Sequence, residues 1–473
     1  MKLTPAAFKS QAIIALKNDS LQRALMRSKS HFIDKRQVAI ANLPIFARLR
    51  QRAVEIKEHT LAHLDFYLEY FEKQVHEQGG QVHWADTPSS ACQQIISICQ
   101  AAQAQQIIKG KSMISEEIGL NNALEQAGFE VTETDLGEYI IQLAQESPSH
   151  IIAPAVHKTR EEVAQLFHQH HHHYHFNPQA TAIPDLVNQA RQVLRDKFLA
   201  ADVGITGANF LIAETGSTVM VTNEGNGDLT RILPRVHIIV ASIEKVVPTL
   251  EDATTLLRLL ARSATGQAMT AYTTLSTGPR RSDDLDGPTE FHVVLVDNGR
   301  SSILGSEFHD ILRCIRCGAC LNHCPVYGAV GGHAYGWVYP GPMGAVLTPL
   351  LLDLKTAIDL PNASTLCGRC EEVCPVQIPL PRLLRYHRIR AHQAKLSPVI
   401  TRFTLQIWAF FARHVKLYQW FTALNIRLLG RLGQNKGRFR YLPFLGAWTA
   451  SRDMPAPQGE TFIALWKKRQ RKQ

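Results

Sequence analysis

The chain has 473 residues, 45% of them hydrophobic and 19% charged, which is the composition of an ordinary globular protein of two to three domains. Its net charge of +10 is uneven, because residues 381–473 hold 19 Lys and Arg against two acids, and the rest of the chain is acidic. There is no N-terminal apolar signal segment and no run of 18 apolar residues, so we expect a cytoplasmic protein without a spanning helix, whose thiols stay reduced.

Residues 1–80 are predicted to form an N-terminal helical arm. Leu61, Leu64, Leu68 and Phe71 recur at the spacing of one helix face, and Gly79-Gly80 ends the segment. We expect these helices to pack on the domain that follows.

Residues 81–300 alternate short apolar runs with helical patterns. This alternation is typical of βαβ units and predicts an α/β domain with a mostly parallel sheet. The expected helices span 89–104 and 116–127 and begin again at Thr159, and the expected strands span 81–85, 106–109, 129–132, 150–154, 208–213, 218–222, 236–241 and 291–296.

Within this domain, residues 202–227 are the candidate small-molecule loops. Their glycines allow close backbone approach to a ligand, and their Thr, Ser and Asn side chains can donate to oxyanions. Glu214 could act as a base or a nucleophile. Ordinary turn chemistry is the favoured interpretation, because the glycine spacing is not a dinucleotide fingerprint.

A histidine tract at His168–His175 also lies in this domain. Such tracts can bind metal, but no cysteine or carboxylate lies near this one in the sequence. A solvated loop is the favoured interpretation.

Seven of the nine cysteines lie between residues 314 and 374. The first group has the spacing C-x2-C-x2-C-x3-C-P, which is typical of bacterial iron–sulfur ligation, and comprises Cys314, Cys317, Cys320 and Cys324. The second group repeats the motif without its first cysteine, and comprises Cys367, Cys370 and Cys374; Ser364 stands at the missing position. The proline after each motif prevents an uninterrupted helix.

In this motif the fourth cysteine reaches the cluster of the other motif. The crossed pattern predicts one [4Fe–4S] cluster on Cys314, Cys317, Cys320 and Cys374, and a second on Cys324, Cys367 and Cys370 with three cysteine ligands. The fourth iron of the second cluster could be bound by Ser364, water, a partner or a substrate, or could be absent.

Zinc and disulfides are the alternatives for these cysteines. Zinc favours closed sets of four ligands in C-x2-C pairs, which fits seven cysteines poorly, and disulfides need an oxidising compartment. Cys92 and Cys99 stand apart on a helical pattern and are predicted to be buried small hydrophobic residues.

Arg313, Arg316 and Arg369 lie beside predicted ligands. Cationic neighbours would favour the reduced, more negative cluster, while a solvated basic face is the equally weighted alternative. About 40 residues with an apolar helical stretch separate the motifs, so residues 301–392 are predicted to form a mostly helical two-cluster ferredoxin-like domain.

The segment 393–473 alternates aromatic and basic residues, among them Phe403, Arg413 and Trp420. It could lie on the inner membrane face as an amphipathic helix, or it could dock a partner protein. No nucleic-acid-binding module is found.

The whole chain resembles the lactate utilization protein B family of bacteria. The resemblance rests on Lys111–Ile118, Gly204–Asn209, Ile212–Ser217, the span Cys314–Pro375 with its truncated second motif, and the basic C-terminal segment. It implies a lactate-utilization domain similar in fold to the ribose-phosphate isomerase and CoA-transferase group, followed by an α-helical ferredoxin domain. It also implies electron transfer in L-lactate oxidation to pyruvate, with two partner proteins.

The leading hypothesis is therefore an iron–sulfur electron-transfer subunit rather than an independent enzyme. The rival is a catalytic subunit that binds the hydroxy acid at Glu214 and the 209–217 loops, with the open iron of the second cluster as a Lewis acid. A third hypothesis gives the clusters a purely structural role.

Overall fold

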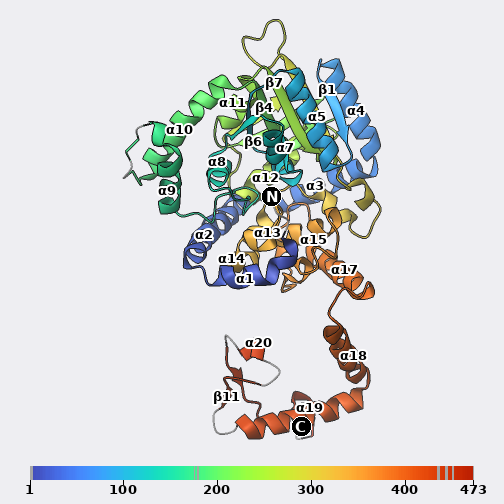
Figure 1. The fold of residues 1–473 in the computed structure, drawn as a ribbon. Coiled ribbons are helices and arrows are strands. Elements are labelled where there is room, and N and C mark those ends of the chain that lie inside the picture. Colours follow the sequence, from blue (N-terminus) through green and yellow to red (C-terminus); the bar gives the residue numbers. More distant parts are fainter. Residues whose placement is uncertain are drawn as a thin grey trace. The chain divides into compact units, whose positions relative to one another are not determined.

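A computed structural model describes residues 4–174, 176–177, 180–433, 437–442, 446–449 and 452–471, with the backbone alone at 28–31 and 447–448. The chain divides into two compact units, Met1–Ala391 and His392–Gln473 (Figure 1). Among the described residues, no helix is both long and apolar enough to cross a membrane.

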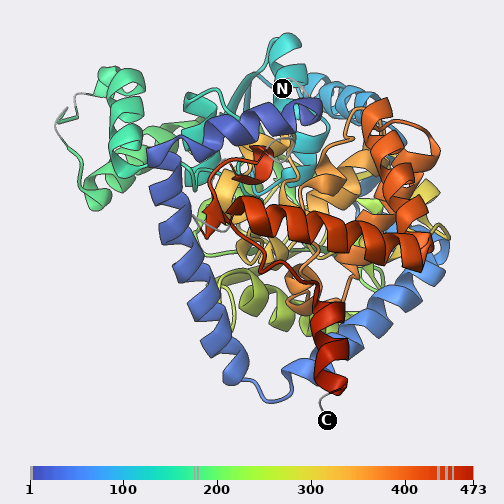
Figure 2. The same cartoon turned by 90° about the horizontal axis from the view of Figure 1, so that it is seen from below.

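The first unit begins with four helices, in agreement with the predicted arm: α1 (Phe8–Leu16), α2 (Asp19–Ala41), α3 (Phe46–Ala62) and α4 (Leu64–Glu77). Asn18 caps α2 by accepting a hydrogen bond from the backbone N–H of Leu21. Figure 2 shows α2 running along the edge of this unit.

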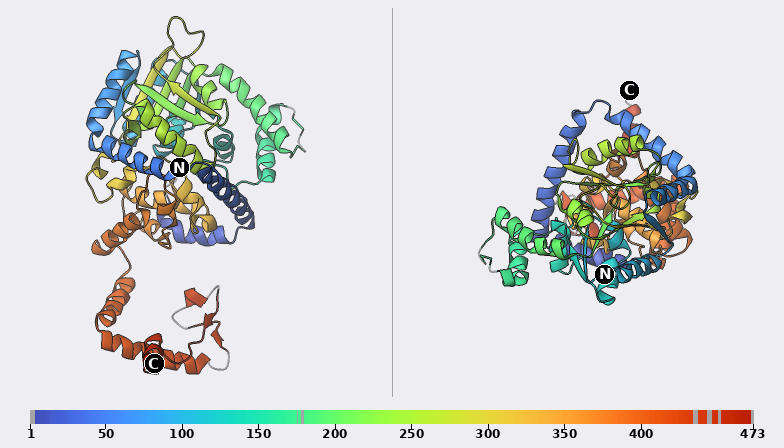
Figure 3. Two further views of the ribbon diagram at one scale, coloured as in Figure 1. Left: turned by 180° about the vertical axis from the view of Figure 1, so that it is seen from behind. Right: turned by 90° about the horizontal axis from the view of Figure 1, so that it is seen from above.

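A six-stranded parallel sheet forms the centre of the α/β domain (Figure 3). Its order is β1 (Gln81–Ala85), β10 (Glu290–Val296), β7 (Val236–Ser242), β4 (Val203–Gly207), β2 (Gln106–Gly110) and β3 (Glu130–Glu133). The strand predicted at 150–154 is wrong, because these residues form bends and turns.

Helices cover both faces of this sheet. Helices α5 (Pro88–Ala101), α6 (Met113–Glu117) and α7 (Leu120–Gln126) share an apolar core with one face, and Cys92 and Cys99 of α5 are buried there as predicted. On the other face lie α4, together with α8 (Leu136–Leu143), α9 (Arg160–His170) and α10 (Ile183–Ala200) beside β2. The predicted helix 116–127 is two helices, separated at Gly119, whose φ is +70°.

A second, four-stranded sheet has the order β8 (Val246–Val247), β5 (Phe210–Ile212), β6 (Ser217–Thr222) and β9 (Tyr272–Ser276). Strands β5 and β6 are antiparallel and joined by a turn at residues 213–216, so the turn interpretation of this stretch is confirmed. Helices α11 (Asn226–Ile232) and α12 (Leu250–Ala264) complete the domain.

The glycine-containing stretch at 203–207 is not a loop but the buried strand β4 in the middle of the sheet. A Cβ at Gly204 would lie 1.8 Å from the carbonyl oxygen of Thr230 in α11, so only glycine allows this close approach.

Gly204→Ala is therefore expected to lower the free energy of unfolding by at least about 2 kcal/mol, because backbone must move to accept the methyl group. Gly225→Ala is the matched control, since no atom lies within 4 Å of its added Cβ. Denaturant unfolding checks the difference, and equal stability of the two variants would contradict the close packing at Gly204.

The cysteine-rich segment contains three helices of a single turn, α13 (Ala319–Asn322), α14 (Tyr327–Val330) and α16 (Arg369–Glu372), and two longer ones, α15 (Gly341–Leu351) and α17 (Leu380–Gln393). Its apolar side chains share one core with α1, α3 and α12, including Phe8, Phe46, Ile56 and Leu256. The N-terminal arm is thus part of the support of the cysteine turns.

The second unit contains α18 (Val399–Arg413), α19 (Val415–Gly433), β11 (Arg438–Phe439), α20 (Gly446–Thr449), β12 (Met454–Pro455) and α21 (Phe462–Gln470). Helix α18 buries no residue, and large apolar side chains such as Phe403, Trp408 and Trp420 are exposed.

Candidate iron–sulfur centre

The first cysteine motif forms a tight turn between a 3-10 helix, η5 (His309–Arg313), and α13. Arg316 and Gly318 have left-handed backbone, with φ of +58° and +72°, and the backbone N–H of Arg316 donates to Cys314 Sγ at 3.4 Å. The backbone of this turn thus wraps around its cysteine sulfur atoms. Hydrogen bonds from N–H groups to ligand sulfurs influence the reduction potential of an iron–sulfur cluster.

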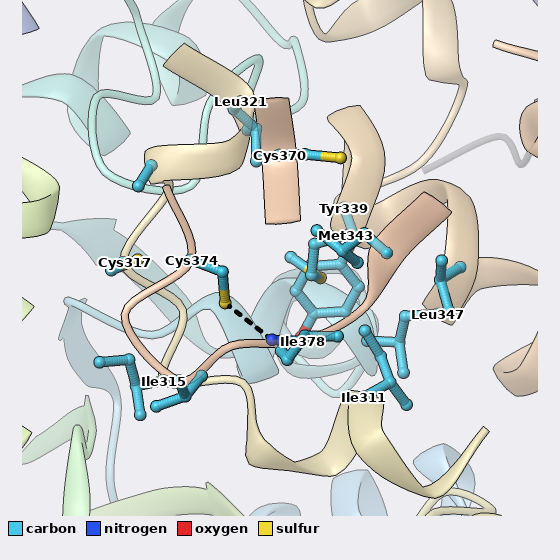
Figure 4. Packing of buried hydrophobic residues seen from close by; sticks show 14 of the residues in the cluster. Ile311, Ile315, Cys317, Leu321, Tyr339, Met343, Leu347, Cys370, Cys374 and Ile378 are labelled. Carbon is cyan, nitrogen blue, oxygen red and sulfur yellow. Dashed lines mark hydrogen bonds between the residues drawn. The ribbon is translucent and has the colours of Figure 1, made fainter. Parts of the chain in front are cut away.

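The second motif repeats this turn before α16. Leu366 and Gly368 have φ of +54° and +83°, and α16 begins directly after Gly368. Further along, the N–H of Ile378 donates to Cys374 Sγ at 3.3 Å (Figure 4).

One small buried cavity brings together the two motifs. Its cysteines are Cys314, Cys317 and Cys320 from the first motif and Cys374 from the second. Apolar side chains such as Ile151, Ile315 and Met343 complete its wall.

The other three cysteines do not line this cavity. Cys324 and Cys370 are buried and Cys367 is exposed. Burial, together with the charges of Cys324 and Cys367, raises the pKa of Cys370 to about 12, which groups these three thiols electrostatically.

The cysteine-lined cavity fits a cluster rather than an ordinary core. Burial raises the pKa of Cys317, Cys320 and Cys374, and their mutual charges raise it further, so four thiolates here need a cation among them. Iron ions would supply that positive charge, and backbone N–H groups already point at the sulfur of Cys314 and Cys374.

The three arginines differ from one another. Arg313 is buried and paired with Glu58 at 3.2 Å, and the partly buried Arg316, 12% exposed, lies over the Tyr339 ring at 4.6 Å. Arg369 is 45% exposed and pairs with Glu372 at 2.6 Å. The solvated-face interpretation therefore holds for Arg369 only.

Two further cations reach the second motif from the N-terminal arm. Arg50 of α3 donates to the carbonyl of Cys374 at 2.7 Å, and Arg36 of α2 donates to that of Val373 at 2.9 Å. Sequence reasoning missed both, because no local pattern links residues more than 300 positions apart.

A buried charge network joins the α/β domain to the first motif. Arg300 makes two hydrogen bonds to Glu117, at 2.8 and 2.6 Å, and lies 3.0 Å from Glu244. Glu244 also pairs with Arg316 at 3.2 Å, and Tyr339 donates to Glu117 at 2.6 Å. Burial alone would lower the pKa of Arg300, but the two carboxylates outweigh it and raise the pKa.

A cavity of about 630 Å³ lies in the α/β domain, with Lys111, Asn209, Ser242 and Lys245 in its wall. Glu214 lies outside it and instead caps α12, its carboxylate accepting from the N–H of Leu250 at 2.6 Å. A role of Glu214 as base or nucleophile is therefore not favoured.

The histidine tract forms the end of α9 and a short turn, with His171 buried against Tyr139; His175 is outside the described residues. Among described residues, a metal-type grouping occurs elsewhere, at Glu146, His157 and His333. Lys158 and His157 contact the two carboxylate oxygens of Glu146 at 2.5 and 2.7 Å, so both oxygens already have a partner within the protein.

A parallel α/β domain joined to a segment that gathers seven cysteines in two repeated turns defines an iron–sulfur protein with an attached α/β domain. Comparisons agree: residues 68–296 match the LUD domain, 310–378 the 4Fe-4S dicluster domain, and 382–471 the C-terminal domain of lactate utilisation protein B. The prediction of an α/β domain followed by a ferredoxin-like cluster domain is confirmed.

The chain belongs to the lactate utilization protein B family. It is 42% identical to the lactate utilization protein B of Bacillus pumilus, over 100% of this chain and 99% of that protein. It is 43% identical to that of Macrococcus caseolyticus (98% and 97%) and 40% identical to the uncharacterized electron transport protein YkgF of Escherichia coli (99% and 98%). A solved DUF162 family protein from Deinococcus radiodurans matches 49% of this chain and 98% of its own, with 14% identity and a TM-score of 0.26.

Proposed function

We propose that this chain is the iron–sulfur electron-transfer subunit of a bacterial system that oxidises L-lactate to pyruvate. The observation that carries the proposal is the cavity lined by Cys314, Cys317, Cys320 and Cys374, which joins two sequence-distant turns around one group of sulfur atoms. The names of the relatives, lactate utilization protein B and electron transport protein, support the same function.

In this proposal Cys314, Cys317, Cys320 and Cys374 hold one [4Fe–4S] cluster, and Cys324, Cys367 and Cys370 hold a second by three thiolates. When bound, such clusters take up and release single electrons. The chain positions them through its two turns, and the N–H groups at the sulfur atoms and the partly buried Arg316 stabilise added negative charge.

Several finer assignments belong to the same proposal. The division into 1–80, 81–300, 301–392 and 393–473, and the kinship of the α/β domain with the ribose-phosphate isomerase and CoA-transferase group, are proposed on the resemblance. So are the two partner proteins of the system. The second unit, with its exposed aromatic and basic side chains, is proposed to contact the inner membrane face.

The hydroxy-acid catalytic alternative is not favoured, because the carboxylate chosen for it, Glu214, caps a helix outside the cavity. The following experiment distinguishes electron transfer from a purely structural role of the clusters. The purified anaerobic chain is mixed with its two partner proteins and L-lactate, and the clusters are followed by electron paramagnetic resonance. We expect lactate to reduce them and an added oxidant to reoxidise them, whereas clusters that lactate never reduces would refute electron transfer.

A further inference from the structure

The two cysteine turns share the same pair of left-handed backbone positions and the same following helix. In the first, left-handed residues stand two and four positions after Cys314, at Arg316 and Gly318. In the second, they stand two and four positions after Ser364, at Leu366 and Gly368. A four-residue helix follows each turn, α13 in the first and α16 in the second.

The side chain of Ser364 also makes the bond that Cys314 makes. The N–H of Arg316 donates to Cys314 Sγ at 3.4 Å, and the N–H of Leu366 donates to Ser364 Oγ at 3.1 Å. Arg388 fixes the position of this turn by donating to the carbonyl of Ser364 at 3.0 Å. The Oγ of Ser364 therefore occupies, in its turn, the place that a ligand sulfur occupies in the first turn.

On the basis of the function proposed above, we propose that Ser364 is the fourth protein ligand of the second cluster, bound through Oγ to the iron that has no cysteine. The Oγ–H proton leaves to solvent as the Oγ–Fe bond forms, and no electron is transferred. A cation lowers the pKa of an oxygen bound to it, which makes the alkoxide accessible.

The test uses the anaerobic full chain with Ser364→Ala and Ser364→Cys, and Ser282→Ala as an exposed-serine control. In Ser364→Ala we expect mild oxidation to release one iron, from about eight to about seven per chain, with the resonance signal of a three-iron cluster. Ser364→Cys keeps about eight irons and changes the Mössbauer parameters of one iron site.

Spectra, iron content and potentials of Ser364→Ala identical to those of the wild type would overturn the assignment. The assignment would also be overturned if Ser364→Cys, like Ser364→Ala, lost one iron per chain. Neither result touches the proposed function, because reduction of the first cluster by lactate and partners is measured separately.

A second inference concerns the cavity of about 630 Å³ in the α/β domain. Lys111 follows β2, Asn209 follows β4, and Ser242 and Lys245 stand at the end of β7. The cavity thus lies at the carboxyl ends of parallel strands, where open α/β sheets bind ligands.

Lys245 is the unusual group in this wall. Lys111 is paired with Asp135 and with Glu224, whereas the Lys245 ammonium has no hydrogen bond or ion pair to any side chain or carbonyl that the structure describes. Burial, with the nearby Arg316 charge, lowers its pKa to about 8, although the charges of Glu244 and Cys314 oppose this shift. A partly buried ammonium that no side chain or carbonyl hydrogen-bonds is costly, and a bound anion would offset that cost.

The cavity also adjoins the first group of cysteines. Arg316 and Ile151 line both this cavity and the one that holds Cys314, Cys317, Cys320 and Cys374. Asn209 uses its carbonyl to accept from the N–H of Val221 at 2.9 Å, which leaves its amide NH₂ as a donor.

We infer that this cavity binds a small 2-hydroxy or 2-oxo carboxylate, with the carboxylate against Lys245. The ligand class rests on the proposed function, and the inference is one of binding alone. It places the organic acid one layer of side chains from the first cluster.

Calorimetry on the anaerobic holoprotein measures binding of pyruvate, L-lactate and inorganic phosphate. We expect pyruvate or lactate to bind, Lys245→Met to weaken binding at least about tenfold, and the exposed control Lys17→Met to leave it unchanged. Bound acid should also change the resonance signal of the reduced first cluster.

Binding of phosphate alone, binding that is equal in Lys245→Met, or no binding at millimolar acid would overturn the inference. Continued reduction of the clusters by lactate and partners in the same preparation would show that the proposed function stands without it.

Discussion

Cys374→Ala is expected to damage the first cluster, although Cys374 belongs to the second motif. The reason is that Cys374 lines the cavity of Cys314, Cys317 and Cys320, which its neighbours in sequence, Cys367 and Cys370, do not line. In the same way, Cys324→Ala should damage the second cluster. Loss of a thiolate ligand removes the cluster or converts it to a three-iron form, so one of the two resonance signals should disappear or change completely.

Two reference variants identify the signals. Cys320→Ala defines the first signal and Cys370→Ala the second, and Cys374→Ala must then match Cys320→Ala, while Cys324→Ala must match Cys370→Ala. Cys99→Ala, a buried thiol in α5, is the control that keeps both signals. If Cys374→Ala matches Cys370→Ala instead, each motif binds its own cluster and the crossed arrangement is wrong.

Arg300→Met is expected to lower the free energy of unfolding by about 3–5 kcal/mol, because it leaves the buried carboxylates of Glu117 and Glu244 without their shared cation. Arg300 is 1% exposed, so water cannot replace it. Denaturant unfolding of the holoprotein, followed by circular dichroism, measures the loss.

Arg382→Met is the matched control, since the side chain of Arg382 is 56% exposed and its pair with Asp310 contributes at most about 1 kcal/mol. The free energy of unfolding of Arg300→Lys should lie between those of Arg300→Met and Arg382→Met, because lysine keeps the positive charge but loses the paired hydrogen bonds. Should Arg300→Met be folded and as stable as Arg382→Met, the network does not hold the α/β domain to the first motif.

Sequence patterns predicted most of the sheet because buried parallel strands are continuous apolar runs, as in Val236–Ser242 and Glu290–Val296. They failed at β4, where Gly204 and Gly207 resemble loop residues. The glycines are required by the approach of Thr230 and Lys111 from other elements, which no local pattern contains. The apolar run at 150–154 failed for the opposite reason, since Ile151 and Ile152 cover cavities instead of pairing in a sheet.

The cysteine turns were predictable because their geometry is local: spacing, glycine and proline lie within a dozen residues. Their surroundings were not, because Arg36, Arg50 and Glu244 reach the turns from distant parts of the chain. Glu214 was chosen for its position at a strand end, and only the fold reveals that it serves as a cap for α12.

The account depends on seven cysteines holding two iron–sulfur clusters. Iron, acid-labile sulfide and zinc are therefore to be measured per chain after oxygen-free purification. We predict about eight iron and about eight sulfide per chain, with no stoichiometric zinc. A colourless protein that lacks sulfide and carries zinc would contradict it.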